Sequence, residues 1–237
     1  TGLTYTIESL SAAATVTVEF EKVTYTLTYT AGANGSITGD SPQYIKYGED
    51  GSEVTAVPAD GYHFVKWSDD VDTAKRTDEN VTADITVTAT FAINEYTVTF
   101  KDWEDKTIGE PQTVEHGKGA SAPDVPARTG YTFTGWDKTF TNVTEDLTVT
   151  AQYSINTHAV TFSVPDGNGS LTAKVGETAI TSGDKVDHFS KVVFTADPAT
   201  GYQVKEWKVN SQVVAADDGT GLTYTIESLS AAATVTV

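Results

Sequence analysis

The sequence contains neither cysteine nor methionine, and it has no apolar run long enough to span a membrane. Without cysteine there is no disulfide framework, no thiolate zinc site and no cysteine nucleophile. Acidic residues outnumber basic ones by 33 to 15, and the formal charge of −18 repels phosphate backbones and anionic lipid surfaces. Methionine is absent even at position 1, where Thr1 begins inside a strand-like pattern. We therefore expect a window cut from a longer protein, with no nucleic acid partner and no membrane insertion in this window.

Signatures of catalysis are equally scarce. The sequence has no Gly-x-Ser-x-Gly elbow, no P-loop and no dinucleotide-binding fingerprint. Its four histidines fall in different modules or strand contexts, and no pair has the spacing of metal ligands; they are His63, His116, His158 and His188. We predict no catalytic residue, no cofactor-binding residue, no histidine metal site and no enzymatic activity.

Two acidic loops are the nearest approach to a metal site. Residues 69–72 (Asp-Asp-Val-Asp) and residues 217–218 (Asp-Asp) each follow a tryptophan-containing strand. Calcium binds several oxygens gathered on one flexible loop, but neither loop matches the EF-hand pattern. Solvated acidic loops are the favoured prediction, and calcium is the weaker alternative.

The two ends of the chain carry the same eighteen residues. TGLTYTIESLSAAATVTV occupies residues 1–18 and again residues 220–237, a period of 219 residues. A long array of near-identical units and a deliberate duplication both explain this identity. The array is favoured, because the duplicated piece looks like a pair of strands and has no tag-like character.

A weaker repeat lies inside the long one. The motif Gly-Tyr-x-Phe/Val-x-x-Trp occurs at residues 61–67, 130–136 and 201–207, each time after a proline and before an alternating strand. This spacing predicts three related modules of about seventy residues. Their expected bounds are 22–95 (the first module), 96–156 (the middle module) and 157–237 (the third module), with residues 1–21 as the tail strands of a preceding copy.

Most of the chain alternates with a period of two residues. Threonine alternates with Val, Leu, Tyr or Phe at residues 25–29 and 96–100, a pattern typical of half-buried strands. No segment offers a sustained helical face, although residues 10–14 and 142–146 each have the length of one helical turn. The fold class predicted is mainly β, made of small α+β modules in an elongated array.

The shared motif predicts the core of each module. In a regular strand the Tyr and the Phe or Val share a face, whereas the Trp faces the other side unless a bulge returns it. Gly135 in the middle motif fits such a bulge. A buried core anchor is favoured over a ligand-stacking platform, since one buried ring removes about 150–250 Å² from water. The predicted core motif comprises Gly61, Tyr62, Phe64, Trp67, Gly130, Tyr131, Phe133, Trp136, Gly201, Tyr202, Val204 and Trp207.

Trp103 is the one tryptophan outside the motif, in the stretch Lys-Asp-Trp-Glu-Asp. Covering the edge of its own module is the favoured role. Contact with a host glycan or matrix protein is the alternative.

The middle module, residues 96–153, resembles the bacterial internalin-type B-repeat family (Listeria–Bacteroides repeat). The tract 114–136 and the ending 147–153 carry most of this likeness, and residues 25–39 and 61–67 are similar to the divergent branch of the family. The resemblance implies small β-grasp-like modules on secreted or cell-wall proteins, chiefly of Gram-positive bacteria, and it brings no catalytic residues.

From the repeats and this resemblance we expect a non-catalytic extracellular stalk or fibre segment at the bacterial cell surface. Its expected partners are other copies of the same protein, joined head-to-tail or by strand swapping. An adhesin module that binds a host glycan or matrix protein is the alternative.

Overall fold

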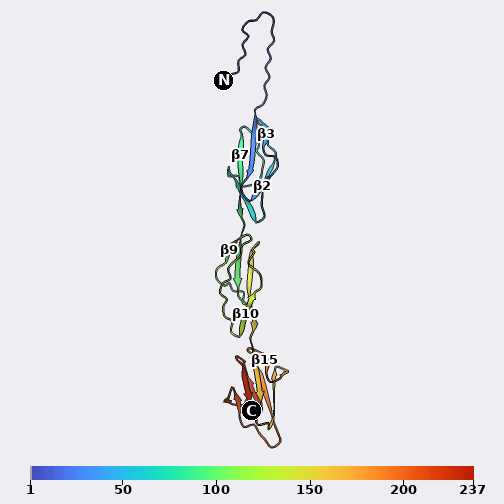
Figure 1. Cartoon of the computed structure of the whole chain (residues 1–237), viewed down its shortest axis with the longest axis vertical. Helices are drawn as coiled ribbons and strands as arrows, with labels where there is room; N and C mark the ends of the chain where they lie inside the picture. The colour runs from blue at the N-terminus through green and yellow to red at the C-terminus, as the bar shows by residue number, and fades with distance from the viewer. Residues whose placement is uncertain (1) are drawn as a thin grey trace. The chain divides into compact units, whose positions relative to one another are not determined.

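The computed structural model describes residues 2–237, which form strands and loops with no helix among them. They divide into two compact units, Thr1–Glu95 and Tyr96–Val237. Several small sheets follow one another along the chain (Figure 1). The prediction of a mainly β chain of tandem modules is confirmed. The α part of the expected α+β modules is wrong for the described residues, where 10–14 and 142–146 are loops. Since no helix is found there, none that could cross a membrane is found either.

The first unit contains two sheets. The larger sheet has the order β3-β1-β7-β5, and the smaller sheet has the order β2-β4-β6. The central strands β1 and β7 run parallel, with Leu27 opposite Ile85 and Tyr29 opposite Val87. The strand bounds are β1 (Thr24–Ala31), β2 (Gly35–Thr38), β3 (Gln43–Lys46), β4 (Val54–Pro58), β5 (Tyr62–Trp67), β6 (Lys75–Arg76) and β7 (Ile85–Ile93).

The middle module forms one sheet with the order β10-β11-β8-β9. Its first and last strands, β8 and β11, again run parallel, with Leu147 opposite Val98. Alternation places Val98 and Phe100 inside, against Val149. The bounds are β8 (Glu95–Lys101), β9 (Gln112–Glu115), β10 (Tyr131–Trp136) and β11 (Leu147–Ile155).

The third module packs a five-stranded sheet, β15-β12-β20-β17-β18, with a four-stranded sheet, β14-β13-β16-β19. Strands β12 and β20 are the parallel pair, with Ala233 opposite Val160. The bounds are β12 (Thr157–Ser163), β13 (Gly169–Val175), β14 (Thr178–Ile180), β15 (Asp184–Asp187), β16 (Val192–Pro198), β17 (Trp207–Val209), β18 (Gln212–Val214), β19 (Thr223–Ile226) and β20 (Ala233–Thr236).

A parallel pair of first and last strands therefore recurs in all three modules. Parallel strands need a long crossover, which most proteins build around a helix. Here the crossover from β1 to β7 contains the short strands β2 to β6 instead. This substitution is the physical reason why the α+β prediction failed: the second layer is made of strands and loops.

The connections between the modules are each one residue long. Strand β7 ends at Ile93 and β8 begins at Glu95, so Asn94 is the only residue between them. Asn156 is likewise the only residue between β11 and β12. Each asparagine is fixed to its preceding module, because the Asn94 N–H donates to the Gly61 carbonyl and the Asn156 N–H donates to the Gly130 carbonyl, both at 2.8 Å.

The identical end segments have different structures. Within residues 220–237, β19 pairs with β16 and β20 pairs with β12, so Leu229 is 2% exposed. Residues 2–23 form no strand, and Leu10, which matches Leu229, is 67% exposed. The difference arises because β16 and β12 are already paired within the third module. The assignment of residues 1–21 as the tail of a preceding copy stays a prediction.

We expect Leu229→Ala to lower the unfolding free energy of the third module by about 2–5 kcal/mol, because it leaves a cavity in a packed core. The matched change Leu10→Ala alters the same letter in the same local sequence and is expected to cost less than about 0.5 kcal/mol. Native-state hydrogen exchange of the β16 amides measures both. Equal effects from the two changes would contradict the assignment of one copy as core and the other as exposed.

Candidate functional site

The shared motif contains a β-bulge in the first two modules. Phe64 lies opposite Phe91 and Trp67 lies opposite Ala89, with the register shift between Phe64 and Lys66. The middle module has the same shift between Phe133 and Gly135. The extra residue places the Trp on the same side as the Phe, so both rings point into the module. The motif glycines that precede these strands, Gly61 and Gly130, have φ angles of 77° and 76°, which favour glycine.

The motif tryptophans are engaged inside their modules. Trp67 and Trp207 are 0% and 1% exposed. The Trp67 Nε1–H donates to the Thr73 carbonyl at 3.0 Å, and the Trp207 Nε1–H donates to the Gly221 carbonyl at 2.9 Å. Trp136 is half-buried and packs edge-on against Phe100, with ring centroids 4.9 Å apart. This geometry is that of a core anchor rather than of an exposed stacking platform.

The third motif departs from the other two. Residues 202–206 form no strand, and the strand begins only at Trp207. Tyr202 is 58% exposed and Val204 replaces the phenylalanine. In the first module the C-terminal half of β7 pairs with the equivalent residues, 62–66.

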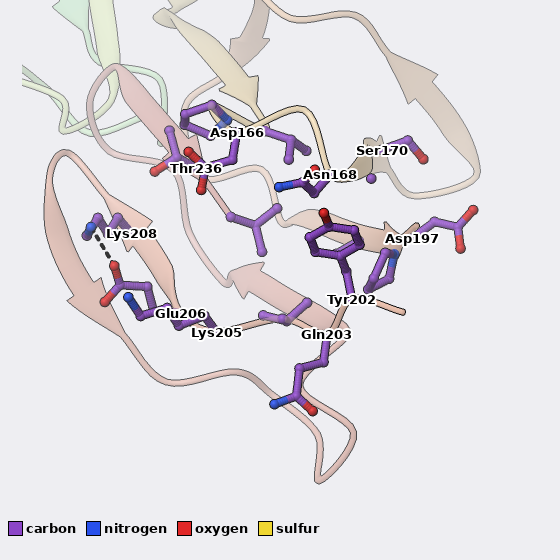
Figure 2. A pocket seen from close by; sticks show the side chains of 17 residues that line it. Asp166, Asn168, Ser170, Asp197, Tyr202, Gln203, Lys205, Glu206, Lys208 and Thr236 are labelled. Atoms are coloured by element: carbon purple, nitrogen blue, oxygen red, sulfur yellow. Dashed lines mark ion pairs between the residues drawn. The ribbon is translucent and has the colours of Figure 1, made fainter. Parts of the chain in front are cut away.

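A groove of about 460 Å³ lies beside this unpaired stretch. The groove is lined by residues 168–170, 196–198 and 202–206, together with Thr236 and Val237 (Figure 2). The Lys208 Nζ contacts the Glu206 carboxylate at 2.6 Å on the rim. The sequence did not predict this groove, because the residues that line it are spread from Val164 to Val237.

Trp103 lies in a cluster that the sequence did not predict. Its ring meets Tyr153 edge-on with centroids 5.1 Å apart, and the Arg128 guanidinium lies 5.1 Å from its centroid. Arg128 also lies 3.7 Å from the ring centroid of Tyr131. Trp103 is half-buried. Its role in covering the edge of its module stays a prediction. The sequence did not indicate a role for Arg128, because a single basic residue in a loop belongs to no periodic pattern.

The acidic loops are held by local contacts. Asp69 accepts a hydrogen bond from the Arg76 Nη1 at 2.8 Å, and Asp70 accepts one from the Lys66 Nζ at 2.7 Å. In the other loop, Asp218 accepts a hydrogen bond from the Leu222 N–H. Within residues 2–237 no group of three or more His, Cys, Asp or Glu residues is arranged to hold a metal ion. Calcium binding stays an untested alternative.

Arg76 is the centre of a buried ionic cluster in the first module. It donates to Asp78 through Nε and Nη2 at 2.8 and 2.7 Å, and its guanidinium lies 5.6 Å from the Trp67 ring centroid. The Tyr29 hydroxyl donates to Asp78 at 2.6 Å. Burial by itself would raise the pKa of Asp78, but hydrogen bonds from Arg76 and Tyr29 outweigh it and hold that pKa below its usual value. The cluster therefore fixes the loop that closes over Trp67.

Strand pairing also brings two histidines together. The His158 Nε2 lies 2.9 Å from the His188 Nδ1, because β12 pairs with β15. The sequence did not indicate this pair, since the two histidines are thirty positions apart. The other modules place Tyr25 near Tyr47 and Tyr96 near His116 at this position. The position therefore takes a ring pair in every module.

Comparison with known families accounts for nearly the whole chain. The divergent InlB B-repeat domain matches residues 25–95 and 161–237, together more than half of the sequence. The chain belongs to the divergent InlB B-repeat family. Its middle part, residues 96–162, matches the related Listeria-Bacteroides repeat domain. The expected kinship with internalin-type repeats is confirmed.

Curated relatives of this B-repeat chain are much longer proteins. Internalin H of Listeria monocytogenes is 32% identical over 198 residues, which cover 72% of the chain and 34% of that protein. A putative membrane protein of Evansella cellulosilytica is 25% identical over 179 residues, covering 69% of the chain and 26% of that protein. The chain thus spans about a third of the length of these relatives or less, and they are surface or membrane-associated repeat proteins.

Two solved structures are also similar to parts of the chain. The Bacillus anthracis TIE protein aligns with a TM-score of 0.36 and 10% identity, over 90% of this chain and 50% of that one. Streptococcal SHIRT domains 3–4 from a cell surface protein align with a TM-score of 0.23 and 17% identity, over 56% of this chain and 98% of that one. Scores of this size do not establish a shared fold.

We expect Arg76→Ala to lower the unfolding free energy of the first module by about 3 kcal/mol, because it leaves the Asp78 carboxylate buried without its cation. The neighbouring change Lys75→Ala removes an exposed ion pair with Glu53 and is expected to cost less than about 1 kcal/mol. Hydrogen exchange of the β7 amides measures both changes. A cost for Arg76→Ala no larger than that for Lys75→Ala would show that the cluster does not stabilise the module.

Proposed function

We propose that the chain is a non-catalytic spacer: an extracellular stalk or fibre segment that extends a bacterial surface protein. The observation that carries this proposal is the one-residue connector. A strand ends, one asparagine intervenes, and the next module's first strand begins. Because the asparagine N–H is bonded back to the preceding module, little free backbone is left for bending.

The burial of the motif tryptophans supports the same role. The most repeated motif in the sequence places its tryptophans in module cores, as Trp67 and Trp207 show. A family of repeat domains found in surface proteins, with relatives such as internalin H, favours a location outside the cell, at a Gram-positive surface. The formal charge of −18 keeps such modules soluble and apart from one another.

We also propose that copies of the unit continue head-to-tail. The identity of residues 1–18 with 220–237 supports this continuation. The proposal has a strand-swapped variant. In this variant, residues 1–18 of one chain enter the third module of another copy. In that case the Leu10→Ala change would weaken self-association in sedimentation.

Small-angle X-ray scattering tests the spacer role. The chain is expected to scatter as a rod, because its connectors are too short for the modules to fold back. Inserting Gly-Gly-Ser-Gly after both Asn94 and Asn156 is expected to shorten the mean end-to-end distance. The same insertion in an exposed turn, after Gly167, is the control and is expected to leave the rod unchanged. A compact particle for the unaltered chain would contradict the proposal.

A second candidate function is an adhesin module that binds a host glycan or matrix protein through Trp103. The favouring observation is the half-buried cluster of Trp103, Arg128 and Tyr153, since aromatic rings beside a cation are common in binding surfaces.

A glycan and matrix-protein array tests this second function. Binding by the unaltered chain is expected to fall at least about tenfold in Trp103→Ala, as for the loss of a central contact residue. The control Tyr44→Ala removes a ring of the first module that is 72% exposed on β3, and this variant is expected to bind normally. No binding by any of the three proteins would remove the adhesin function.

A further inference from the structure

We propose that Phe189 fixes the third module to the middle module, by packing its ring against the motif glycine Gly130 across the one-residue connector. The proposal rests on the spacer function proposed above, and it names a side chain that holds one joint of the spacer. Three rings take part, those of Phe189, His188 and His158, and together they are called the joint ring stack.

Phe189 has a backbone conformation that favours glycine. Its φ angle is 68°, and the equivalent residues of the other modules are Gly48 and Gly117, with φ angles of 80° and 76°. The N–H groups of these three residues donate to equivalent carbonyls that precede the closing strands, those of Val81, Val143 and Leu229. A bulky residue at positive φ is strained. Since glycine satisfies the turn in two modules, the phenylalanine is expected to serve a purpose outside the turn.

The Phe189 side chain lies outside the core of the third module. Phe189 is 48% exposed, and it is not among the residues that form that core or pack against it. Its ring meets the His188 ring edge-on, with centroids 4.2 Å apart, and the His188 Nδ1 lies 2.9 Å from the His158 Nε2. The His188 N–H donates to the Asn156 carbonyl at 2.7 Å. The joint ring stack therefore lies beside the connector.

Across the connector, the joint ring stack meets Gly130 of the middle module. A Cβ atom added at Gly130 would lie 2.6 Å from the Phe189 Cε2 and 2.7 Å from the His188 Cδ2. Both distances are too short for two carbon atoms, so the rings occupy the space that a side chain would need, and glycine permits this close approach. The Asn156 N–H donates to the carbonyl of the same glycine at 2.8 Å. Gly130 thus contacts both the connector and the rings.

The joint between the middle and third modules is therefore held by side chains as well as by backbone. Adjoining modules move relative to one another unless an interface holds them. At the equivalent position of the middle module, Gly117 has no side chain to offer. The division of the chain into compact units agrees with this difference, because the middle and third modules belong to one unit, Tyr96–Val237.

Pulsed electron–electron distance measurements on the full chain test the role of Phe189. The sequence has no cysteine, so nitroxide labels attach only to introduced cysteines at exposed positions. Glu145→Cys with Glu177→Cys reports the joint between the middle and third modules. Phe189→Gly is expected to widen this distance distribution at least about twofold, because the contact that holds the modules is lost. An unchanged width would overturn the proposal.

A second label pair is the control for this measurement. Ser36→Cys with Glu145→Cys reports the joint between the first and middle modules, and both positions are exposed. Its distribution is expected to be the same with and without Phe189→Gly, because residue 189 belongs to the third module. Equal widening of both pairs would point to a general loosening of the chain and would overturn the proposal.

A second substitution separates the ring from the backbone. Asparagine has no ring and adopts positive φ more readily than most residues. Phe189→Asn is therefore expected to widen the distribution between the middle and third modules as much as Phe189→Gly does. Widening by the glycine variant alone would overturn the proposal, because it would arise from the flexibility of glycine.

Hydrogen exchange of the β16 amides distinguishes a joint residue from one that stabilises its own module. In both variants these amides are expected to exchange no faster than in the unaltered chain, because the strain at position 189 is relieved. Faster exchange would overturn the proposal. Scattering judges the spacer role separately: unchanged widths in a rod remove the role of Phe189 alone, and the expected widening in a chain that is compact removes the spacer alone.

Discussion

The parallel pairing of the first and last strands is the constraint on which each module depends. Leu27, Val98 and Val160 lie on the opening strands and are fully buried. Each of them lies opposite a residue of the closing strand, so the closing strand contributes to its burial. The contact joins the two ends of a module that is about seventy residues long, so folding has to close a long loop before this pairing is gained. Everything between the two strands, including the bulged motif, is arranged around that pair.

The same pairing sets the connection between modules. Since the closing strand of one module and the opening strand of the next are adjacent in sequence, the chain passes from one to the other through a single asparagine. A bulge turns each motif tryptophan of the first two modules inward beside the closing strand, so the most distinctive residues of the sequence pack inside their modules. The cluster of Trp103 with Arg128 and the groove beside Tyr202 do not include these tryptophans.

Several features were readable from the sequence for clear reasons. Period-two alternation indicated strands because a half-buried strand exposes one side and buries the other. The repeated motif indicated tandem modules, and Gly135 indicated a bulge, because these depend on local geometry. The Arg76 cluster was not readable, since Arg76 and Tyr29 are far apart in sequence and meet only when β4 pairs with β6 and the two sheets pack. The α part of the α+β modules was predicted wrongly for the described residues, because short strands and loops fill the crossover.

The sequence by itself determined the strand pattern, the repeat and the family. Each of these depends on residues that are close together in the sequence or on motifs that recur in it. Only the tertiary structure decided which identical residues are buried. Residues 220–237 contain a pair of strands and the described residues 2–18 form none, although the amino acids are the same. Leu229 is covered because β12 and β16 provide edges for its strands to join, and Leu10 has no such edge available. Burial is a property of the partner strand as much as of the residue, and sequence alone does not contain the partner's position.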